Sequence, residues 1–166
     1  LNLGIKTNNI KSALLKFTGV QRRMTKIFEK NGNEFYDDYA HHPTEIYSVL
    51  ESIKKVANQK KITSVFQPHR FSRVSLLKKE FSKSFKFSDR VVLCPIYAAG
   101  EKIDKKIDLI KFGRMIALNS NVELIIVKDE ENFKNFFKKN LIKNEIVIGM
   151  GAGSISYWMR NLKQSL

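Results

Sequence analysis

The sequence predicts an α/β fold, with a mostly parallel, doubly wound sheet, helices on both faces and an N-terminal β-hairpin. From about residue 60 onward, four short and nearly continuous apolar runs alternate with helical segments. Strands that are covered on both faces have this composition. Nearer the N-terminus, an Asn-Gly pair stands between two strand-like runs, as in a tight hairpin. Strand–helix alternation of this kind gives a sheet with helices on both faces.

The expected elements follow in chain order. Residues 1 to about 16 are expected to form a helix or a linker, because their helical periodicity is weak. The hairpin is expected to pair residues 24–30 with residues 33–38 across Asn31-Gly32, since both central positions of a type I′ turn need positive φ. The four later strands are expected at residues 62–66, 90–94, 122–127 and 145–149.

Helical periodicity separates these strands. Apolar residues recur at spacings of three, four and seven between Ile46 and Val56. A second stretch repeats an apolar residue every four positions, at Leu77, Phe81 and Phe85. Asp129 is a suitable N-cap for a third helix, which carries three phenylalanines at 133, 136 and 137.

Length and composition are those of one domain. The 166 residues are 43% hydrophobic, which suffices for a core, and without a run of 18 apolar residues no membrane span is expected. The N-terminus has neither an initiator Met nor the apolar core of a signal peptide, so we expect a piece of a longer protein. The single Cys94 cannot form an intramolecular disulfide, which is compatible with a cytoplasmic location.

The formal net charge of +14 raises the question of nucleic-acid binding. Of the 30 basic residues, 23 are Lys, and they are scattered along the expected helix faces. No aromatic–basic ribbon or known nucleic-acid motif accompanies them. A solvated lysine-rich surface or a small anionic substrate accounts for the charge, so we expect neither a nucleic acid nor a membrane as partner.

The rarest residue types gather in three short segments, at residues 19–23, 37–45 and 66–73. These segments hold all three His, four of the seven Arg and two of the three Pro. The last two segments each follow an expected strand and open a helix. Because ligands of doubly wound sheets bind at the carboxyl ends of the strands, we expect these two segments to share one ligand-binding face.

The middle segment admits two interpretations. Asp37 and Asp38 end a strand at its carboxyl edge, where a carboxylate can accept ribose hydroxyls or help to hold a hydrated Mg²⁺. His41 and His42 add hydrogen-bonding groups near neutral pH. Alternatively, an Asp/His pair caps the following helix and holds the turn, with Pro43 in the first helical turn. Adjacent histidines rarely converge on one ion, and no Cys or HxxxH partner exists, so no metal site is expected.

The third segment places Arg70 and Arg73 three residues apart at an expected helix start, and therefore on one helix face. Two guanidinium groups beside a helix N-terminus make an anion site for a carboxylate or a phosphate. The alternative is a surface Arg pair that nearby acids neutralise. Pro68 and His69 restrict the local geometry and favour the anion site.

Five motifs, in order, resemble those of Mur ligase C-terminal domains, and in particular of the alanine-adding member. Residues 38–43, Asp-Tyr-Ala-His-His-Pro, are similar to the DYxHxP signature, and residues 66–73 to FQPHR(Y/F)(T/S)R. The resemblance spans roughly residues 10 to 163 and departs from the pattern at Met24, where Phe is usual. The other motifs are Phe17-Thr18-Gly19-Val20-Gln21-Arg22-Arg23, similar to FxGxxRRF, Tyr97-Ala98-Ala99-Gly100-Glu101, similar to YxAGE, and the glycine turn Gly151-Ala152-Gly153-Ser154-Ile155.

The resemblance implies a Rossmann-like C-terminal domain at residues 17–166, preceded at residues 1–16 by the tail of a central ATPase domain. Ligases of this kind join an amino acid to a UDP-muramate through an acyl phosphate, with ATP and Mg²⁺, in peptidoglycan synthesis. This chain has no G-x-x-x-x-G-K-[ST] phosphate loop. We therefore expect most phosphate and metal ligands, and the UDP-N-acetylmuramate site, to lie outside it, and expect the chain alone to be inactive.

The resemblance also implies roles for particular residues on the nucleotide side of the site. Asp38 is implied to bind the ATP ribose, and Arg23 to lie near ribose or phosphate. His41 and Tyr39 are implied to be the catalytic pair that faces the junction between acyl phosphate and amine.

On the amino-acid side, His69, Arg70 and Arg73 are implied to hold the carboxylate of L-alanine. Catalysis would then rest on positioning and charge stabilisation rather than on a covalent protein nucleophile.

Two other interpretations stay open. Inside the family, the ligase that recycles a tripeptide onto UDP-muramate shares the DYxHxP region but differs in its counterpart of residues 69–73. Outside the family, a basic doubly wound binding module with no chemistry of its own fits the composition.

Overall fold

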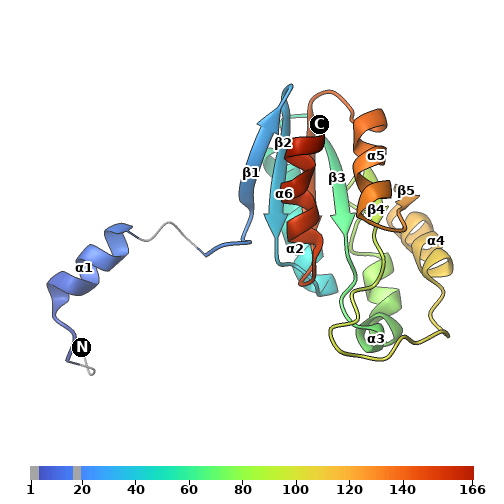
Figure 1. Ribbon diagram of the computed structural model, residues 1–166, viewed down its shortest axis with the longest axis horizontal. Coiled ribbons are helices and arrows are strands. Elements are labelled where there is room, and N and C mark those ends of the chain that lie inside the picture. Colours follow the sequence, from blue (N-terminus) through green and yellow to red (C-terminus); the bar gives the residue numbers. More distant parts are fainter. Residues whose placement is uncertain (1–3, 17–19) are drawn as a thin grey trace.

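A mixed six-stranded sheet forms the centre of the computed structural model, which describes residues 4–16 and 20–166 (Figure 1). The strand order is β1-β2-β6-β3-β4-β5. Only β1 and β2 pair antiparallel within the described residues, and every other pair of neighbours is parallel. The predicted mostly parallel sheet is thus confirmed. The strands are β1 Thr25–Lys30, β2 Asn33–Asp38, β3 Lys61–Phe66, β4 Arg90–Leu93, β5 Glu123–Ile126 and β6 Glu145–Met150.

The N-terminal hairpin forms where the Asn-Gly pair predicted it. Asn31 has φ 53° and Gly32 has φ 79°, the left-handed conformation that both central residues of a type I′ turn require. The two strands pair from Lys30 opposite Asn33 back to Thr25 opposite Asp37. The hairpin therefore adds an antiparallel edge to an otherwise parallel sheet.

Helices α2 to α5 occupy connections between strands, whereas α1 precedes β1 and α6 follows β6. The helices in the described residues are α1 Thr7–Lys16, α2 Pro43–Val56, α3 Phe71–Ser82, α4 Leu109–Ser120, α5 Glu130–Asn140 and α6 Ile155–Ser165. The N-terminal segment is thus a helix over most of its length, although α1 contributes no buried residue. The expected domain boundary after Lys16, and the Phe17-Thr18-Gly19 part of the first motif, lie outside the described residues.

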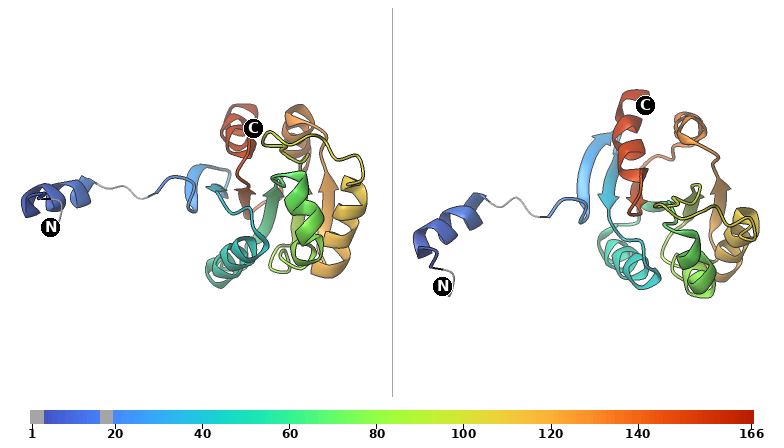
Figure 2. Two further views of the ribbon diagram at one scale, coloured as in Figure 1. Left: turned by 90° about the horizontal axis from the view of Figure 1, so that it is seen from below. Right: turned by 60° about the horizontal axis from the view of Figure 1, so that its bottom comes forward.

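Helices cover both faces of the sheet, as Figure 2 shows, with α2, α3 and α4 on one side and α5 and α6 on the other. The strands supply both faces because successive side chains of a strand point in opposite directions. In β3, for example, Ile62 and Phe66 pack in the cluster with α2, α3 and α4, whereas Val65 packs in the cluster with α5 and α6. The predicted double covering is therefore confirmed.

Two details differ from the sequence pattern. Helix α3 is irregular at Leu77, which has φ −112° and ψ 19°, and it ends at Ser82, so that Phe85 lies in a turn beyond it. Phe85 is nonetheless fully buried, and its position in the core explains the four-residue apolar spacing. Strand β5 was expected to be covered on both faces, but it is the sheet edge and is only half-buried.

The register of the three central strands fixes where the functional segments lie. Met150, the last residue of β6, pairs with Asp38 at the end of β2 and with Phe66 at the end of β3. Because the three strands are parallel, the segments that follow them leave the sheet at the same edge. Those segments are the middle and third clusters of rare residues and the late glycine turn.

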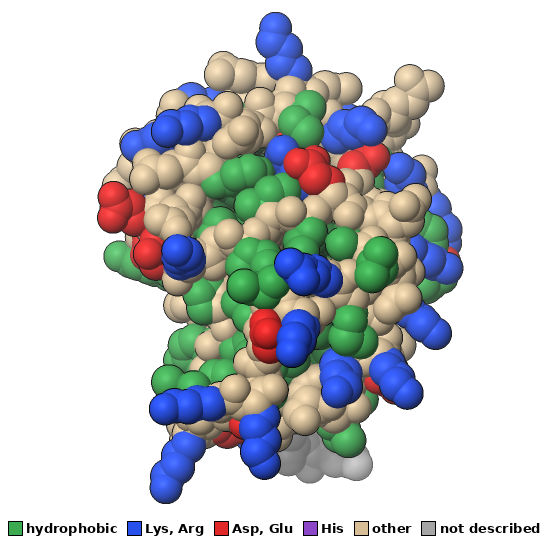
Figure 3. All heavy atoms as spheres, turned by 90° about the vertical axis from the view of Figure 1, so that its right-hand side faces the viewer, with side chains coloured by type: hydrophobic (Ala, Val, Ile, Leu, Met, Phe, Trp, Pro, Cys, Tyr) green, Lys and Arg blue, Asp and Glu red, His purple; other side chains and the backbone are tan. Residues whose placement is uncertain are grey.

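Basic side chains are spread out rather than gathered on the one face of the molecule that Figure 3 shows. On the face shown in Figure 3, Lys and Arg side chains lie in separate places among hydrophobic and acidic ones. None of the helices that the structure describes is both long and apolar enough to span a membrane.

Candidate functional site

The carboxyl edge of the sheet brings the two predicted segments together. His41 belongs to the connection between β2 and α2, and His69 to the connection between β3 and α3, yet their rings lie 6.0 Å apart between centroids. Strand β6 separates β2 from β3 in the sheet, so the glycine turn that follows β6 lies between these two connections. The predicted common face is confirmed.

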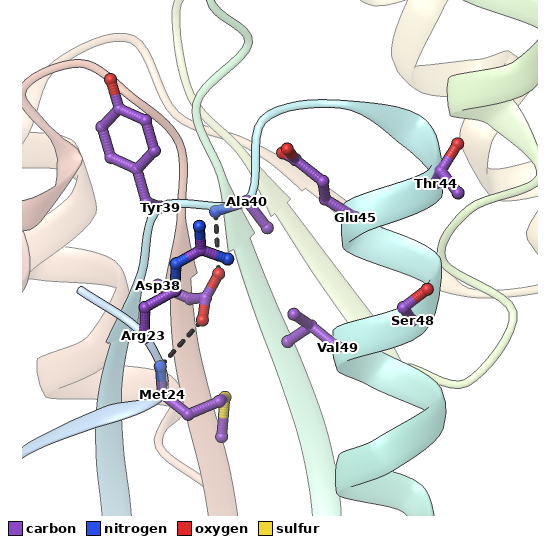
Figure 4. Close-up of a pocket in the computed structure, with 9 residues that line it drawn as sticks. All are labelled: Arg23, Met24, Asp38, Tyr39, Ala40, Thr44, Glu45, Ser48 and Val49. Atoms are coloured by element: carbon purple, nitrogen blue, oxygen red, sulfur yellow. Dashed lines mark hydrogen bonds between the residues drawn. The ribbon is translucent and has the colours of Figure 1, made fainter. Parts of the chain in front are cut away.

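A cavity of about 480 Å³ opens beside the end of β2 (Figure 4). Asp38 and Arg23 line it, and the opposite wall comes from α2. Asp38 is 4% exposed, and its two carboxylate oxygens accept hydrogen bonds of 2.8 Å from the backbone N–H groups of Met24 and Ala40. Asp38 thus holds the turn around the cavity and also presents its carboxylate to it. The lining residues are Arg23, Met24, Asp38, Tyr39, Ala40, Thr44, Glu45, Ser48 and Val49.

Asp37 faces the other way, because it is the neighbour of Asp38 in a strand. It is fully buried and bonds to α6, where Ser156 Oγ donates to its Oδ2 at 2.5 Å and Arg160 Nη2 donates to the same oxygen at 3.3 Å. The sequence treated both carboxylates as candidate ligand groups. That interpretation is wrong for Asp37, whose carboxylate does not line the cavity.

The N-terminus of α2 is capped by the middle segment. His42 is the N-cap residue, its ring nitrogen Nδ1 accepts from the backbone N–H of Thr44 at 3.4 Å, and Pro43 occupies the first turn. Glu45 reaches back and accepts from the backbone N–H groups of His41 at 2.9 Å and His42 at 3.1 Å. These bonds lower the pKa of Glu45, although burial acts in the opposite sense as the largest single influence. The capping role that the sequence left open therefore belongs to His42, with Asp38 holding the turn.

Tyr39 and His41 form a pair above this turn. The His41 Nδ1 lies 2.9 Å from the Tyr39 carbonyl oxygen, and the two rings meet edge to face at 5.1 Å. The side chain of Tyr39 is exposed, so its hydroxyl is available to a ligand. His41 Nδ1 is also 3.5 Å from a Glu45 carboxylate oxygen.

His69 is held on the opposite side by Tyr97. Their rings stack at 5.5 Å with an interplanar angle of 19°, and the two residues form an isolated parallel β-bridge. Burial lowers the pKa of His69, and the positive charge of Arg73 lowers it further, followed by His41 and Arg70. A neutral imidazole is therefore favoured beside two guanidinium groups.

The positions of Arg70 and Arg73 relative to α3 differ from the sequence prediction. Arg70 has φ 72° and ψ 131°, so it is the residue before α3 rather than part of its first turn. The argument from helical spacing is therefore wrong for this pair, because only Arg73 lies within the helix. The backbone N–H of Arg70 donates to the Tyr97 carbonyl at 2.8 Å, which holds this left-handed residue in place.

Arg73 contains a buried nitrogen, Nη1, that has no hydrogen-bond partner among the described residues, and His69 Nδ1 is in the same state. Buried polar atoms of this kind are rare in folded proteins and call for an explanation. At Arg73, a bound carboxylate or phosphate would provide it.

Residues of the YxAGE and glycine-turn motifs support this arrangement. Glu101 accepts from the Ser72 backbone N–H at 3.1 Å and from its hydroxyl at 2.5 Å, and so caps α3 from a different loop. Gln67 Oε1 accepts from the Ile155 backbone N–H at 3.0 Å, which joins the β3 end to the start of α6. A side chain at Gly153 would meet Gln67 and Tyr97, both 2.5 Å from the position of its Cβ. The sequence showed these motifs but not their contacts.

Within the part of the chain that the structure describes, no three His, Cys, Asp or Glu side chains come together in a way that could hold a metal ion. The site contains arginine side chains, aromatic rings and two carboxylates that line the cavity, those of Asp38 and Glu45. Arg23, Asp38 and the β2–α2 connection with His41 lie on the cavity side, whereas His69, Arg70 and Arg73 follow β3, on the other side of the glycine turn.

Comparison with known proteins gives a family match over most of this site. The model of the family described as "Mur ligase, glutamate ligase domain" matches residues 22–153. A UDP-N-acetylmuramate–L-alanine ligase of Pelagibacter ubique is 49% identical over 164 residues, which are 99% of this chain and 35% of that protein. The chain thus spans about a third of the length of the curated relatives that it matches.

Solved structures agree with the fold. The crystal structure of a UDP-N-acetylmuramate–alanine ligase from Thermotoga maritima superposes with a TM-score of 0.68 at 27% identity, over 98% of this chain and 34% of that one. A murein peptide ligase from Psychrobacter arcticus superposes with a TM-score of 0.72, over 99% of this chain and 34% of that one. At 18% identity, the second similarity concerns the fold alone.

Proposed function

Because this chain belongs to the Mur ligase family through its glutamate ligase domain, we propose that it is the C-terminal domain of a UDP-N-acetylmuramate–L-alanine ligase. The observation that carries the proposal is the meeting of His41 with His69, Arg70 and Arg73 at one sheet edge, beside a cavity that Asp38 and Arg23 line. The sequence similarity to alanine-adding relatives over the whole chain supports the choice of amino acid.

On the nucleotide side, the cavity fits the ribose end of ATP. The Asp38 carboxylate already accepts two backbone N–H groups, but each oxygen retains lone pairs for a ribose hydroxyl. Arg23 lines the same cavity and brings a positive charge to ribose or phosphate. ATP, with Mg²⁺, supplies the phosphoryl group that activates the muramate carboxylate as an acyl phosphate.

On the amino-acid side, Arg70 and Arg73 bind the carboxylate of L-alanine. The buried and unpartnered Nη1 of Arg73 supports this role, because a carboxylate satisfies such a donor. His69, kept neutral by burial and by the arginines, donates or accepts a hydrogen bond without adding a third positive charge.

Between the two subsites, Tyr39 and His41 face the place where the amine attacks. Their exposed polar groups orient the amine and stabilise charge that develops during acyl transfer. The attack forms the C–N bond of the amide and releases phosphate. Residues of this chain therefore contribute positioning and charge, not a covalent nucleophile.

The remaining parts of the reaction belong to other domains. We propose that residues 1–16 are the tail of a central ATPase domain, and that residues 17–166 form the domain described above. UDP-N-acetylmuramate and most phosphate and metal ligands then bind outside this chain, which is inactive alone. A cytoplasmic location fits these substrates.

A titration of the complete gene product separates this proposal from its rivals. Isothermal titration with L-alanine, with the free tripeptide and with a random oligonucleotide is carried out in the presence of UDP-N-acetylmuramate and a non-hydrolysable ATP analogue. The proposal predicts that, of these three titrants, only L-alanine binds saturably. Tripeptide binding indicates the recycling ligase, and oligonucleotide binding with a steep salt dependence indicates a nucleic-acid protein.

A further inference from the structure

Arg22 is a residue of the FxGxxRRF motif to which the proposed reaction assigns no role. Its Nε lies 3.5 Å from Oδ1 of Asp37, and its Nη2 donates to the carbonyl oxygen of Gly151. Asp37 is fully buried and also receives Ser156 and Arg160 from α6. A buried carboxylate of this kind is tolerated only when cations and donors surround it. The Arg22 guanidinium is held by its charge attraction to Asp37 and by the hydrogen bond from Nη2 to Gly151, because Nε and Oδ1 make no hydrogen bond within the described residues.

The same guanidinium lies over the ring of Tyr39, with 4.7 Å between its central carbon and the ring centroid. At this distance a guanidinium is attracted to the face of an aromatic ring. The Tyr39 side chain is 43% exposed, so few neighbours restrict it. Arg22 therefore links the partly exposed Tyr39 ring to the buried Asp37 carboxylate.

The backbone around Arg22 is held to the same strand end. Arg22 and Met24 have φ values of 59° and 48°, which non-glycine residues rarely adopt. The Arg22 carbonyl accepts from the Tyr39 N–H at 2.8 Å, and the Met24 N–H donates to Asp38 at 2.8 Å. Tertiary contacts thus maintain a strained turn, which is common where a side chain must be aimed.

We propose that Arg22 is a positioning residue that orients the Tyr39 ring, and through it His41, toward the reacting groups. Tyr39 transmits the effect because its carbonyl oxygen lies 2.9 Å from His41 Nδ1 and its ring meets the His41 ring edge to face. The inference rests on the proposed function. It gives the two adjacent arginines different roles. Arg23 binds the nucleotide, and Arg22 orients Tyr39 and His41.

A double-mutant cycle in the complete gene product tests this role. Arg22→Gln removes the cation, Tyr39→Ala removes the ring, and the third variant carries both changes. We expect Arg22→Gln to lower kcat about tenfold, as for loss of a strong cation–π contact, with little change in the KM for ATP. Arg22→Lys, which keeps the charge, should recover part of the loss. In the Tyr39→Ala background, Arg22→Gln should lower kcat no further. An equal loss in both backgrounds would overturn the proposal.

Arg160→Gln is the matched control. Arg160 pairs with the same Asp37 carboxylate, but from α6, so its loss weakens the ion pair and leaves the cation over Tyr39 in place. We expect this variant to melt at a lower temperature and to keep the wild-type kcat. If Arg160→Gln and Arg22→Gln lower kcat equally, the effect belongs to the stability of the Asp37 network, and Arg22 has no positioning role.

A spectroscopic readout follows the Tyr39 ring without the reaction. The complete gene product is labelled with 3-fluorotyrosine, and the Tyr39 signal is assigned with Tyr39→Phe. Arg22→Gln should shift and broaden that fluorine signal, whereas Arg160→Gln should not. An unchanged Tyr39 signal in an alanine-ligating enzyme overturns this inference alone. A protein that does not ligate alanine overturns the proposed function, whatever the signal does.

Discussion

The imidazole rings of His41 and His69 lie with 6.0 Å between their centroids, although each belongs to a different strand–helix connection. His69 is also close to Arg73, Arg70 and Glu101, of which only Glu101 favours the protonated ring. Burial and the cations outweigh that carboxylate, so the pKa of His69 lies below 6.5.

The lowered pKa of His69 predicts a pH dependence of stability. In the folded protein His69 releases its proton at a lower pH than in the unfolded chain, so the unfolded state binds more protons between the two pKa values. The contribution of His69 is fully present above about pH 6.5, the unfolded value, and is lost as the pH falls through the folded pKa. Urea unfolding of wild type and His69→Gln between pH 5 and 8 measures this, and NMR of the ring gives the folded pKa. Parallel pH profiles, with a ring pKa at or above 6.5, would contradict the prediction.

Arg73→Ala is predicted to raise the KM for L-alanine more than Arg70→Ala does. Arg73 has a buried and unpartnered donor, whereas Arg70 is exposed. We expect losses in kcat/KM for alanine of roughly ten- to a hundredfold per residue, with a small change in the KM for ATP. Lys at position 73 should rescue only in part, because an ammonium lacks the planar two-donor fork. Steady-state kinetics of the complete gene product, with each substrate varied in turn, measures these effects.

Arg114→Ala serves as the control for the two arginines, since Arg114 is an exposed residue of α4. It should leave the alanine KM unchanged. If Arg73→Ala also keeps a normal alanine KM and loses only stability, the two arginines are structural.

Asp38→Ala is predicted to have two effects. It removes the acceptor of the Met24 and Ala40 N–H groups, which should lower the free energy of unfolding by about 1–3 kcal/mol. It should also raise the KM for ATP more than the KM for alanine. Asp89→Ala is the matched control. The Asp89 carboxylate accepts a hydrogen bond of 2.8 Å from the Ile62 N–H, and Asp89 does not line the cavity. A loss of stability with an unchanged KM for ATP would limit Asp38 to holding the turn.

The sequence predicted the strands, the hairpin and the common edge because those depend on local patterns. The Asn31-Gly32 turn and the apolar run of β6 are signals of a few adjacent residues. The remaining contacts of the site join residues that are distant in sequence, so no local sequence pattern predicts them. Glu101 caps α3 from another loop, and Arg22 pairs with Asp37 only because the first turn folds back on β2. The left-handed backbone of Arg70 likewise follows from its bond to Tyr97.

A buried ion pair at the opposite edge of the sheet yields a stability prediction. Arg90 Nη2 lies 2.8 Å from Glu145 Oε1, and both side chains are almost fully buried. Arg90→Met should cost about 3–5 kcal/mol, because it leaves a buried carboxylate without its cation. The double variant with Glu145→Leu should recover much of that loss. Lys55→Ala breaks an exposed pair with Glu51 and should cost less than about 1 kcal/mol in the same urea titrations. If Arg90→Met lowers the free energy of unfolding by less than about 1 kcal/mol, as expected for the exposed pair, the prediction is contradicted.

Gly153→Ala tests how closely the glycine turn approaches the side of the site where we propose that the amino acid binds. The new Cβ would lie 2.5 Å from both Gln67 Oε1 and Tyr97 Cγ, so Tyr97 must move, and with it the stacked His69. We expect the KM for alanine to rise at least severalfold. Gly113→Ala, within α4 and against leucine and isoleucine side chains, is the control that should affect stability alone. Equal alanine KM values for the two variants would exclude the proposed contact.

The central claim is tested most directly by alanine-dependent phosphate release. The complete gene product is incubated with UDP-N-acetylmuramate, ATP, Mg²⁺ and each amino acid in turn, and the nucleotide product is identified by mass. We predict phosphate release that requires L-alanine and yields UDP-N-acetylmuramoyl-L-alanine, with none from residues 1–166 alone. Release that requires a tripeptide in place of L-alanine, or turnover by residues 1–166 alone, would contradict the account.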